Sequence, residues 1–233
     1  MMLDNGPFSS YWNRYTVGPP IRPLREGTTS STEIAHLIIA FLVLSFDFVL
    51  LYGGLAIYDT GTELLLIAIA ASAAITGFVA HEIAHKLSAQ RRGYRAEFRL
   101  SVLGLAVSVV TAALGFLFAA PGATIIGGAT DADDWGRISL AGPATNFGFS
   151  LGFLLGAFVA SGLPGGGLLA FILLFLAFVN AWFAAFNMIP IGPLDGRKVY
   201  RWSAAIWAVS FAAFVALAGV LYYLVYYAPP LNL

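Results

Sequence analysis

The residues best suited to chemistry form the segment His81-Glu82-Ile83-Ala84-His85, which lies inside an apolar stretch. On a helix, side chains four residues apart share a face, so the two imidazoles can bind one cation. The glutamate beside the first histidine can then take a proton from a water molecule held by that cation. This H-E-x-x-H spacing is typical of zinc-dependent peptide hydrolysis. Ionisable groups are costly inside an apolar segment that can cross a membrane, which favours a functional role over polar packing at a helix interface.

A zinc site of this kind needs a third protein ligand and an open position for water. The chain contains no cysteine, so the third ligand must be a carboxylate or a histidine. Asp195 is the best placed, because it follows a helix end broken by two prolines, where the backbone can approach the site closely. An aspartate that only caps the last helix is the alternative. The other candidates are Asp47, His36 and the acidic residues at 131–134.

Asp47 lies in the middle of an apolar segment, where it must be protonated or paired with a polar group on a neighbouring helix. His36 lies near the end of the same segment and is expected at the membrane interface rather than as a ligand. Either residue remains open as a functional group at this stage.

Two asparagines lie close to the same elements. Asn187 precedes Asp195 by eight residues, and its amide can orient a substrate or stabilise a developing oxyanion. An ordinary asparagine at a helix end is the alternative. Asn146 follows a Gly-Pro pair at 142–143 and is expected to hydrogen-bond between helices, or to hold backbone open near the site.

The composition indicates an all-α polytopic membrane protein. Hydrophobic residues make up 59% of the chain and charged residues 10%, against about 45–50% and 25% in soluble domains. The net charge is zero, so nothing points to nucleic acid as a partner. Residues 1–32 are expected to form a cytosolic tail, and residues 33–233 a single transmembrane domain. Five segments are long and apolar enough to cross a bilayer: 33–58, 62–91, 138–159, 168–189 and 202–227.

The basic residues predict the orientation of these segments. Arg14, Arg22 and Arg25 precede the first span, the cluster at 91–99 follows the second, and the cluster at 197–201 follows the fourth. Under the positive-inside rule all three groups are cytosolic. The amino terminus is therefore expected in the cytosol, and the metal site in the cytosolic half of the cell membrane.

The apolar segment 100–120 would disturb this orientation if it crossed the bilayer completely. The second basic cluster and Asp195 would then lie on the face opposite the histidines. We therefore predict that the chain between residues 99 and 137 dips into the membrane and returns, with a short β-like piece at 123–126. Irregular backbone is tolerated at that depth where protein buries it or where it lines a wet cavity.

Three ordered motifs resemble the site-2 protease family of intramembrane zinc metalloproteases. They are the H-E-x-x-H segment, Gly142-Pro143-x-x-Asn146, and Asn187-x-x-Pro190-x-x-Pro193-Leu194-Asp195-Gly196. The similarity covers about residues 64–201. It implies that His81, His85 and Asp195 bind one Zn²⁺ per chain and that Glu82 is the general base. It also implies that Asn187 and Asn146 assist at the active site.

The same resemblance implies regulated proteolysis within the membrane. The expected partners are the lipid bilayer and a transmembrane protein substrate, whose extended segment would pair with the re-entrant β element. No PDZ or CBS segment is visible, so we expect a minimal form of the family. The alternative is a catalytically inactive or transport-related metal-binding membrane protein.

Overall fold

The computed structural model describes residues 29–53, 59–127 and 131–227. Five helical segments in this part of the chain are long and apolar enough to span a membrane. One of them joins three pieces, α3 (Thr60–Ala74), the π-helical turn η1 (Ile75–Val79) and α4 (Ala80–Gln90). The other four are α2 (Ser31–Gly53), α6 (Ala132–Ser161), α7 (Gly167–Asn187) and α9 (Ala204–Tyr226). The predicted polytopic, mainly helical fold is thereby confirmed.

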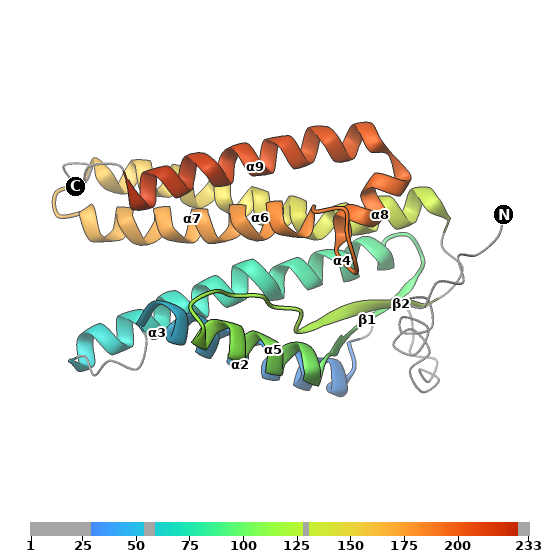
Figure 1. Ribbon diagram of the computed structural model, residues 1–233, viewed down its shortest axis with the longest axis horizontal. Helices are drawn as coiled ribbons and strands as arrows, with labels where there is room; N and C mark the ends of the chain where they lie inside the picture. The colour runs from blue at the N-terminus through green and yellow to red at the C-terminus, as the bar shows by residue number, and fades with distance from the viewer. Residues whose placement is uncertain (1–28, 54–58, 128–130, 228–233) are drawn as a thin grey trace.

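The long helices run roughly along one axis and form two layers (Figure 1). One layer holds α2 and α5 (Val102–Ala113), and the other holds α6, α7 and α9. The continuous α3–α4 segment contacts both layers, because it packs against α2 on one side and against α6 and α7 on the other. A short helix, α8 (Asp195–Trp202), connects α7 to α9.

The chain after α4 enters the bundle and returns, as predicted. Strand β1 (Arg95–Leu100) pairs antiparallel with β2 (Gly122–Gly127), and Leu100 lies opposite Gly122. The intervening helix α5 has 12 residues, too few to cross hydrocarbon. Because the two strands are neighbours, both ends of this re-entrant element lie at the same end of the molecule. The predicted β piece at 123–126 lies within β2.

Several predicted boundaries were wrong by a few residues. The second span begins at Thr60 and not at residue 62, because the carboxylate of Asp59 accepts hydrogen bonds from the first-turn amides. The third span begins at Ala132 and continues through Pro143 without a break. The last span begins at Ala204 and not at residue 202, because Trp202 ends α8 and the Ser203 hydroxyl caps α9. Residues 1–28 of the predicted tail and residues 54–58 of the first predicted span lie outside the described residues.

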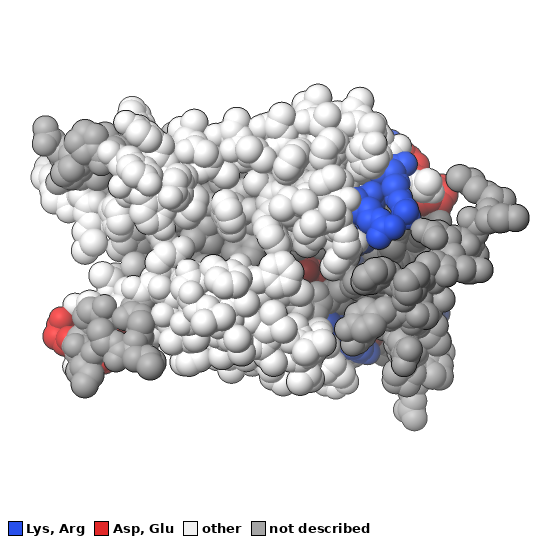
Figure 2. All heavy atoms as spheres, viewed as in Figure 1, with Lys and Arg blue, Asp and Glu red and all other residues white. Residues whose placement is uncertain are grey.

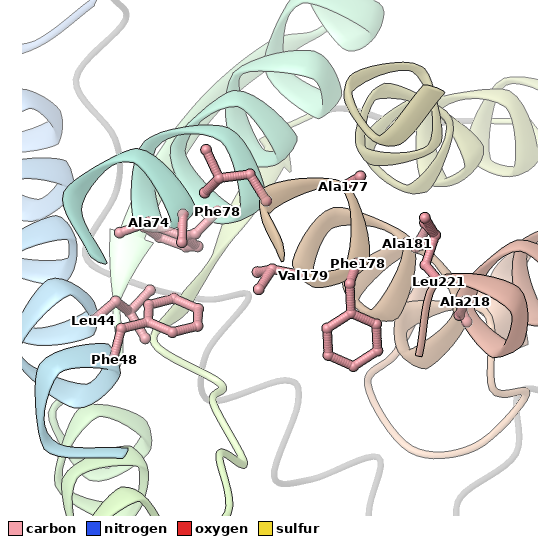
Figure 3. Packing of buried hydrophobic residues seen from close by; sticks show 14 of the residues in the cluster. Leu44, Phe48, Ala74, Phe78, Ala177, Phe178, Val179, Ala181, Ala218 and Leu221 are labelled. Atoms are coloured by element: carbon pink, nitrogen blue, oxygen red, sulfur yellow. The ribbon is translucent and has the colours of Figure 1, made fainter. Parts of the chain in front are cut away.

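Small and aromatic side chains fill the core between the layers (Figure 3). Leu44 and Phe48 of α2 lie close to Ala74 and Phe78 of the second span. On the other side of the bundle, Ala181 of α7 lies close to Leu221 and Ala218 of α9. Because alanine lets backbones approach closely, these contacts hold the helices in a fixed arrangement around the polar site.

The charged side chains on the face shown in Figure 2 lie mainly at the two ends of the molecule. A group of Lys and Arg atoms covers the end that carries α8, while the middle is almost free of charge. Acidic atoms are visible in the middle only in a recess between the two layers. An uncharged belt of this kind is what a hydrocarbon environment requires.

Candidate metal centre

Three side chains from two distant parts of the chain converge on one point. His81 and His85 come from α4, and Asp195 is the first residue of α8. The Nε2 atoms of the two histidines are 2.9 Å apart. Oδ2 of Asp195 lies 3.0 Å from Nε2 of His85 and 3.3 Å from Nε2 of His81. Ligand atoms around a tetrahedral zinc ion are about 3.3 Å apart, since each bond is about 2.0–2.1 Å long. The triangle therefore has the size of a metal site.

Hydrogen bonds at the opposite ring nitrogens fix the tautomer of both histidines. Nδ1 of His81 lies 2.6 Å from Oδ1 of Asn146, and Nδ1 of His85 lies 2.7 Å from the carbonyl oxygen of Ile138. Both partners are acceptors, because the Asn146 amide nitrogen donates elsewhere, so each Nδ1 carries the proton. Each Nε2 then presents a lone pair, and two lone pairs facing each other at 2.9 Å repel unless a cation lies between them.

Gly142 of α6 provides the room for such a cation. A Cβ atom at this position would lie 2.4 Å from Nε2 of His85 and 2.6 Å from Nε2 of His81. Any other residue would therefore place a methyl or larger group against the two ligand atoms. This steric conflict explains why residue 142 is a glycine, which its sequence position alone did not reveal.

Asp195 is held by its own helix and by a close backbone contact. The Lys198 ammonium donates to Oδ1 at 3.2 Å, which leaves Oδ2 directed at the histidines. Burial alone raises the pKa of the Asp195 carboxyl, but the neighbouring His85 and Lys198 side chains oppose it more strongly and hold that pKa well below its usual value. Gly196 lets the start of α8 lie against the backbone at Met188, because a Cβ on residue 196 would lie 2.0 Å from the Met188 carbonyl oxygen.

A buried amide chain supports His81. Oδ1 of Asn146 accepts from the imidazole, while its Nδ2 donates to the carbonyl of Gly77 at 2.9 Å and to Oδ1 of Asn180 at 3.2 Å. Asn180, on α7, in turn donates to the Thr76 hydroxyl at 2.9 Å. Both asparagines are completely buried. The π-helical turn supplies the carbonyl at residue 77, because π-turns widen the backbone and free its acceptors.

Sequence reasoning missed Asn180, whereas it predicted a role for Asn187 at the active site. In the structure the Asn187 amide donates to the carbonyl of Phe183, one turn earlier on the same helix. Its proposed part in catalysis stays a prediction. One signal could have found Asn180: it is a polar amide in an otherwise apolar segment, seven residues before Asn187.

Glu82 projects from the same helix as the histidines and is nearly buried. The hydroxyl of Thr124, on β2, donates to its Oε2 atom at 2.9 Å. The re-entrant element therefore touches the glutamate that the motif identifies as a base.

The other candidates for a third ligand lie elsewhere. In the described part of the chain, the group formed by His81, His85 and Asp195 is the one whose ligand atoms are close enough to share an ion. Asp47 is fully buried on α2, and its carboxylate oxygens have no hydrogen-bond partner among the described residues. Nδ1 of His36 faces the amide of Leu100 at 3.5 Å. The acidic residues at 131–134 cap α6 and bind neighbouring side chains.

A buried ion pair beside the centre was not anticipated from the sequence. Lys86 follows the second histidine and binds the carboxylate of Glu33, at the start of α2. The same carboxylate accepts the amide of Phe98 at 3.0 Å. Glu33 thus ties α2, α4 and β1 together at the end of the bundle that carries the metal centre.

The arrangement as a whole is that of a polytopic membrane protein with a three-ligand metal centre inside its helices. Two neutral imidazoles and one ionised carboxylate form a donor set that suits a divalent transition metal. A carboxylate next to them can act on a water molecule. This combination is the chemistry of a metal-dependent hydrolase.

Comparison with known proteins gives the same class. A protein of Methanocaldococcus jannaschii named "Putative zinc metalloprotease MJ0611" is 33% identical over 182 residues, which are 77% of this chain and 89% of that protein. "Putative zinc metalloprotease Rip3" of Mycobacterium tuberculosis is 32% identical over 134 residues, 57% of this chain and 30% of that protein. No protein-family model and no solved structure matches the chain. The chain belongs to the site-2 protease-like family of zinc metalloproteases.

Proposed function

We propose that this protein is an intramembrane zinc metalloprotease that hydrolyses peptide bonds within or near the transmembrane helices of other membrane proteins. The observation that carries the proposal is the convergence of three ligand atoms, within 3.3 Å of one another, inside a bundle of apolar helices. A metal centre that acted on soluble peptides would have no reason to lie between membrane-spanning helices, where polar groups are costly.

His81, His85 and Asp195 are the residues that would hold the zinc ion. When bound, zinc lowers the pKa of a water molecule towards about 7 and polarises a carbonyl group. Three protein ligands are the number that catalytic zinc sites use, and a water molecule would complete the set. The bonds from Asn146 and Ile138 keep both imidazoles turned towards the centre.

Glu82 is the general base in this proposal. It accepts a proton as the water attacks the peptide carbonyl and later delivers that proton to the leaving amine. Its low exposure keeps bulk water from competing with the substrate. Asn187 is proposed to donate to the developing oxyanion once substrate is bound, because its amide ends the helix that leads to Asp195.

The substrate must present an extended segment, because a helical peptide hides its carbonyl groups in hydrogen bonds. Helix-destabilising residues near the scissile bond should therefore favour cleavage. We place the active site in the cytosolic half of the cell membrane, with the amino terminus in the cytosol, because the basic residues gather at the end that carries α8. Cleavage of this kind would serve regulated intramembrane proteolysis.

The test uses purified protein in proteoliposomes with a model single-span substrate whose transmembrane segment contains helix-destabilising residues. Wild-type protein should cleave it, and a zinc chelator should stop cleavage. Glu82→Gln should keep its zinc and lose activity by about a thousandfold or more, since proton transfer is lost. Glu63→Gln is the matched control, because Glu63 lies on the same span in the first turn of α3.

Full activity of Glu82→Gln would remove this residue from its assigned role. Zinc bound by a wild-type protein that cleaves no membrane substrate would favour an inactive or transport-related metal protein instead.

A further inference from the structure

Thr124 is the residue of the re-entrant element that contacts the proposed base. Its Oγ1 atom lies 2.9 Å from Oε2 of Glu82 and 3.3 Å from the main-chain oxygen of the same residue. A hydroxyl has a single proton, and the closer, charged acceptor is the better one. The carboxylate is thus held at one oxygen by a group that belongs to a different element from its own helix.

The register of the sheet shows how the rest of Thr124 is oriented. Thr124 lies opposite Phe98, whose amide donates to Glu33 of α2 and not to β2. The pair is therefore of the non-hydrogen-bonded kind, in which the N–H and C=O groups of both residues point away from each other. The backbone of Thr124 consequently faces the outer edge of β2, while its side chain faces α4.

The two outer edges of the sheet differ. Side chains of α2, from Glu33 and His36, approach the amides of Phe98 and Leu100 along the edge of β1. Among the described residues the sheet has two strands, so the edge of β2 has no further strand beside it. Thr124 therefore connects the proposed base to the sheet edge that, among the described residues, neither a strand nor the side chains of α2 cap.

We propose that Thr124 is a positioning residue for peptide hydrolysis, a proposal that rests on the proposed function. Its hydroxyl holds Oε2 of Glu82, so that the other carboxylate oxygen is the one directed at the attacking water. The glutamate side chain has several rotatable bonds, and an anchored carboxylate keeps the geometry that proton transfer demands. Because Thr124 belongs to β2, the same residue holds the base and forms part of the edge at which a peptide strand would pair.

The experiment compares Thr124→Val, which removes the hydroxyl at nearly equal size, with Thr124→Ser, which keeps it. Initial rates are measured in proteoliposomes over a range of single-span substrate densities, and zinc is measured in the same preparations. Thr124→Val should lower kcat by about tenfold to a hundredfold, the effect of losing one hydrogen bond to a charged group. Its KM and its zinc content should stay within about twofold of the wild type. Thr124→Ser should restore kcat.

Thr111→Val is the matched control for loss of a threonine hydroxyl within the re-entrant element. The Thr111 hydroxyl accepts the amide of Phe118 and donates to the carbonyl of Ser108, so it stabilises the local fold without touching Glu82. The variant is expected to unfold at a lower temperature and to keep its kcat.

The proposal is overturned by any of three results: an unchanged kcat in Thr124→Val, a loss of zinc in that variant, or an equal fall of kcat in Thr111→Val. Each would show that the hydroxyl acts through general folding or through the metal centre, or not at all. A wild-type protein that cleaves nothing would refute the proposed function itself, which is a different outcome from an active wild type with an equally active Thr124→Val.

Discussion

The metal centre and Asp47 are two buried polar sites within the same bundle, and their surroundings differ completely. At the metal centre the Nδ1 atom of each imidazole has a hydrogen-bond partner, and Asp195 is held by Lys198. At Asp47 neither carboxylate oxygen has a hydrogen-bond partner among the described residues, although the Ser108 hydroxyl of α5 lies near it. Burial alone therefore does not distinguish a functional acidic residue from a structural one.

The two sites differ because several ligand atoms meet at the metal centre, whereas Asp47 stands alone in the described part of the chain. An isolated acidic group on an apolar helix can lose its charge by protonation and remain tolerable. At the metal centre the Nδ1 atom of each histidine is bonded on the far side of its ring, so both Nε2 atoms face one another and Asp195, an arrangement that suits a shared cation. Orienting partners on the far side of each ligand are thus the mark of a metal site.

The largest effect is expected from a substitution that fills the space beside the two ligand nitrogens of the metal centre. Gly142→Ala should abolish zinc binding and reduce cleavage to background, because the added carbon would lie 2.4 Å from one ligand nitrogen and 2.6 Å from the other. Alanine also favours helix formation over glycine by about 1 kcal/mol, so unfolding of α6 is not the expected cause. Zinc content and cleavage rate are the measurements.

Gly148→Ala is the control, since a Cβ at this position of α6 would meet no atom within 4 Å. It should leave zinc and activity unchanged. Normal zinc binding by Gly142→Ala would mean that the ion does not lie between the two imidazoles.

The two asparagines provide a smaller and more selective test. Asn146→Ala should weaken zinc binding by about tenfold to a hundredfold, because it removes the group that orients His81. Asn187→Ala should keep its zinc affinity, because the Asn187 amide bonds within its own helix and not to a metal ligand. It should lower kcat, because the proposed donor to the oxyanion is lost. Zinc titration with a competing chelator, together with steady-state rates, separates the two. The reverse pattern would exchange the roles assigned to them.

The sequence predicted the parts of the fold that follow from local spacing and charge. The separation of His81 from His85 fixes their common face on any helix, and the basic clusters at 91–99 and 197–201 required the chain between the second and third spans to return. The re-entrant element was deduced from that requirement, and the pairing of β1 with β2 confirms it.

The contacts that orient the site could not be predicted in this way. Asn180 reaches Asn146 because α7 packs against α6, and Thr124 reaches Glu82 because β2 packs beside α4. No local pattern in the sequence records which elements face each other. The π-helical turn before the histidines leaves no mark in the periodicity of an apolar segment. The ion pair between Glu33 and Lys86 likewise joins residues that are distant in the chain.

Metal analysis of three purified proteins tests the central claim most directly: the wild type, Asp195→Ala and Asp47→Ala. The wild type and Asp47→Ala should each contain about one zinc ion per chain, whereas Asp195→Ala, with one of three ligands removed, should contain far less. A full zinc content in Asp195→Ala, or its loss in Asp47→Ala, would contradict the ligand set described for this centre.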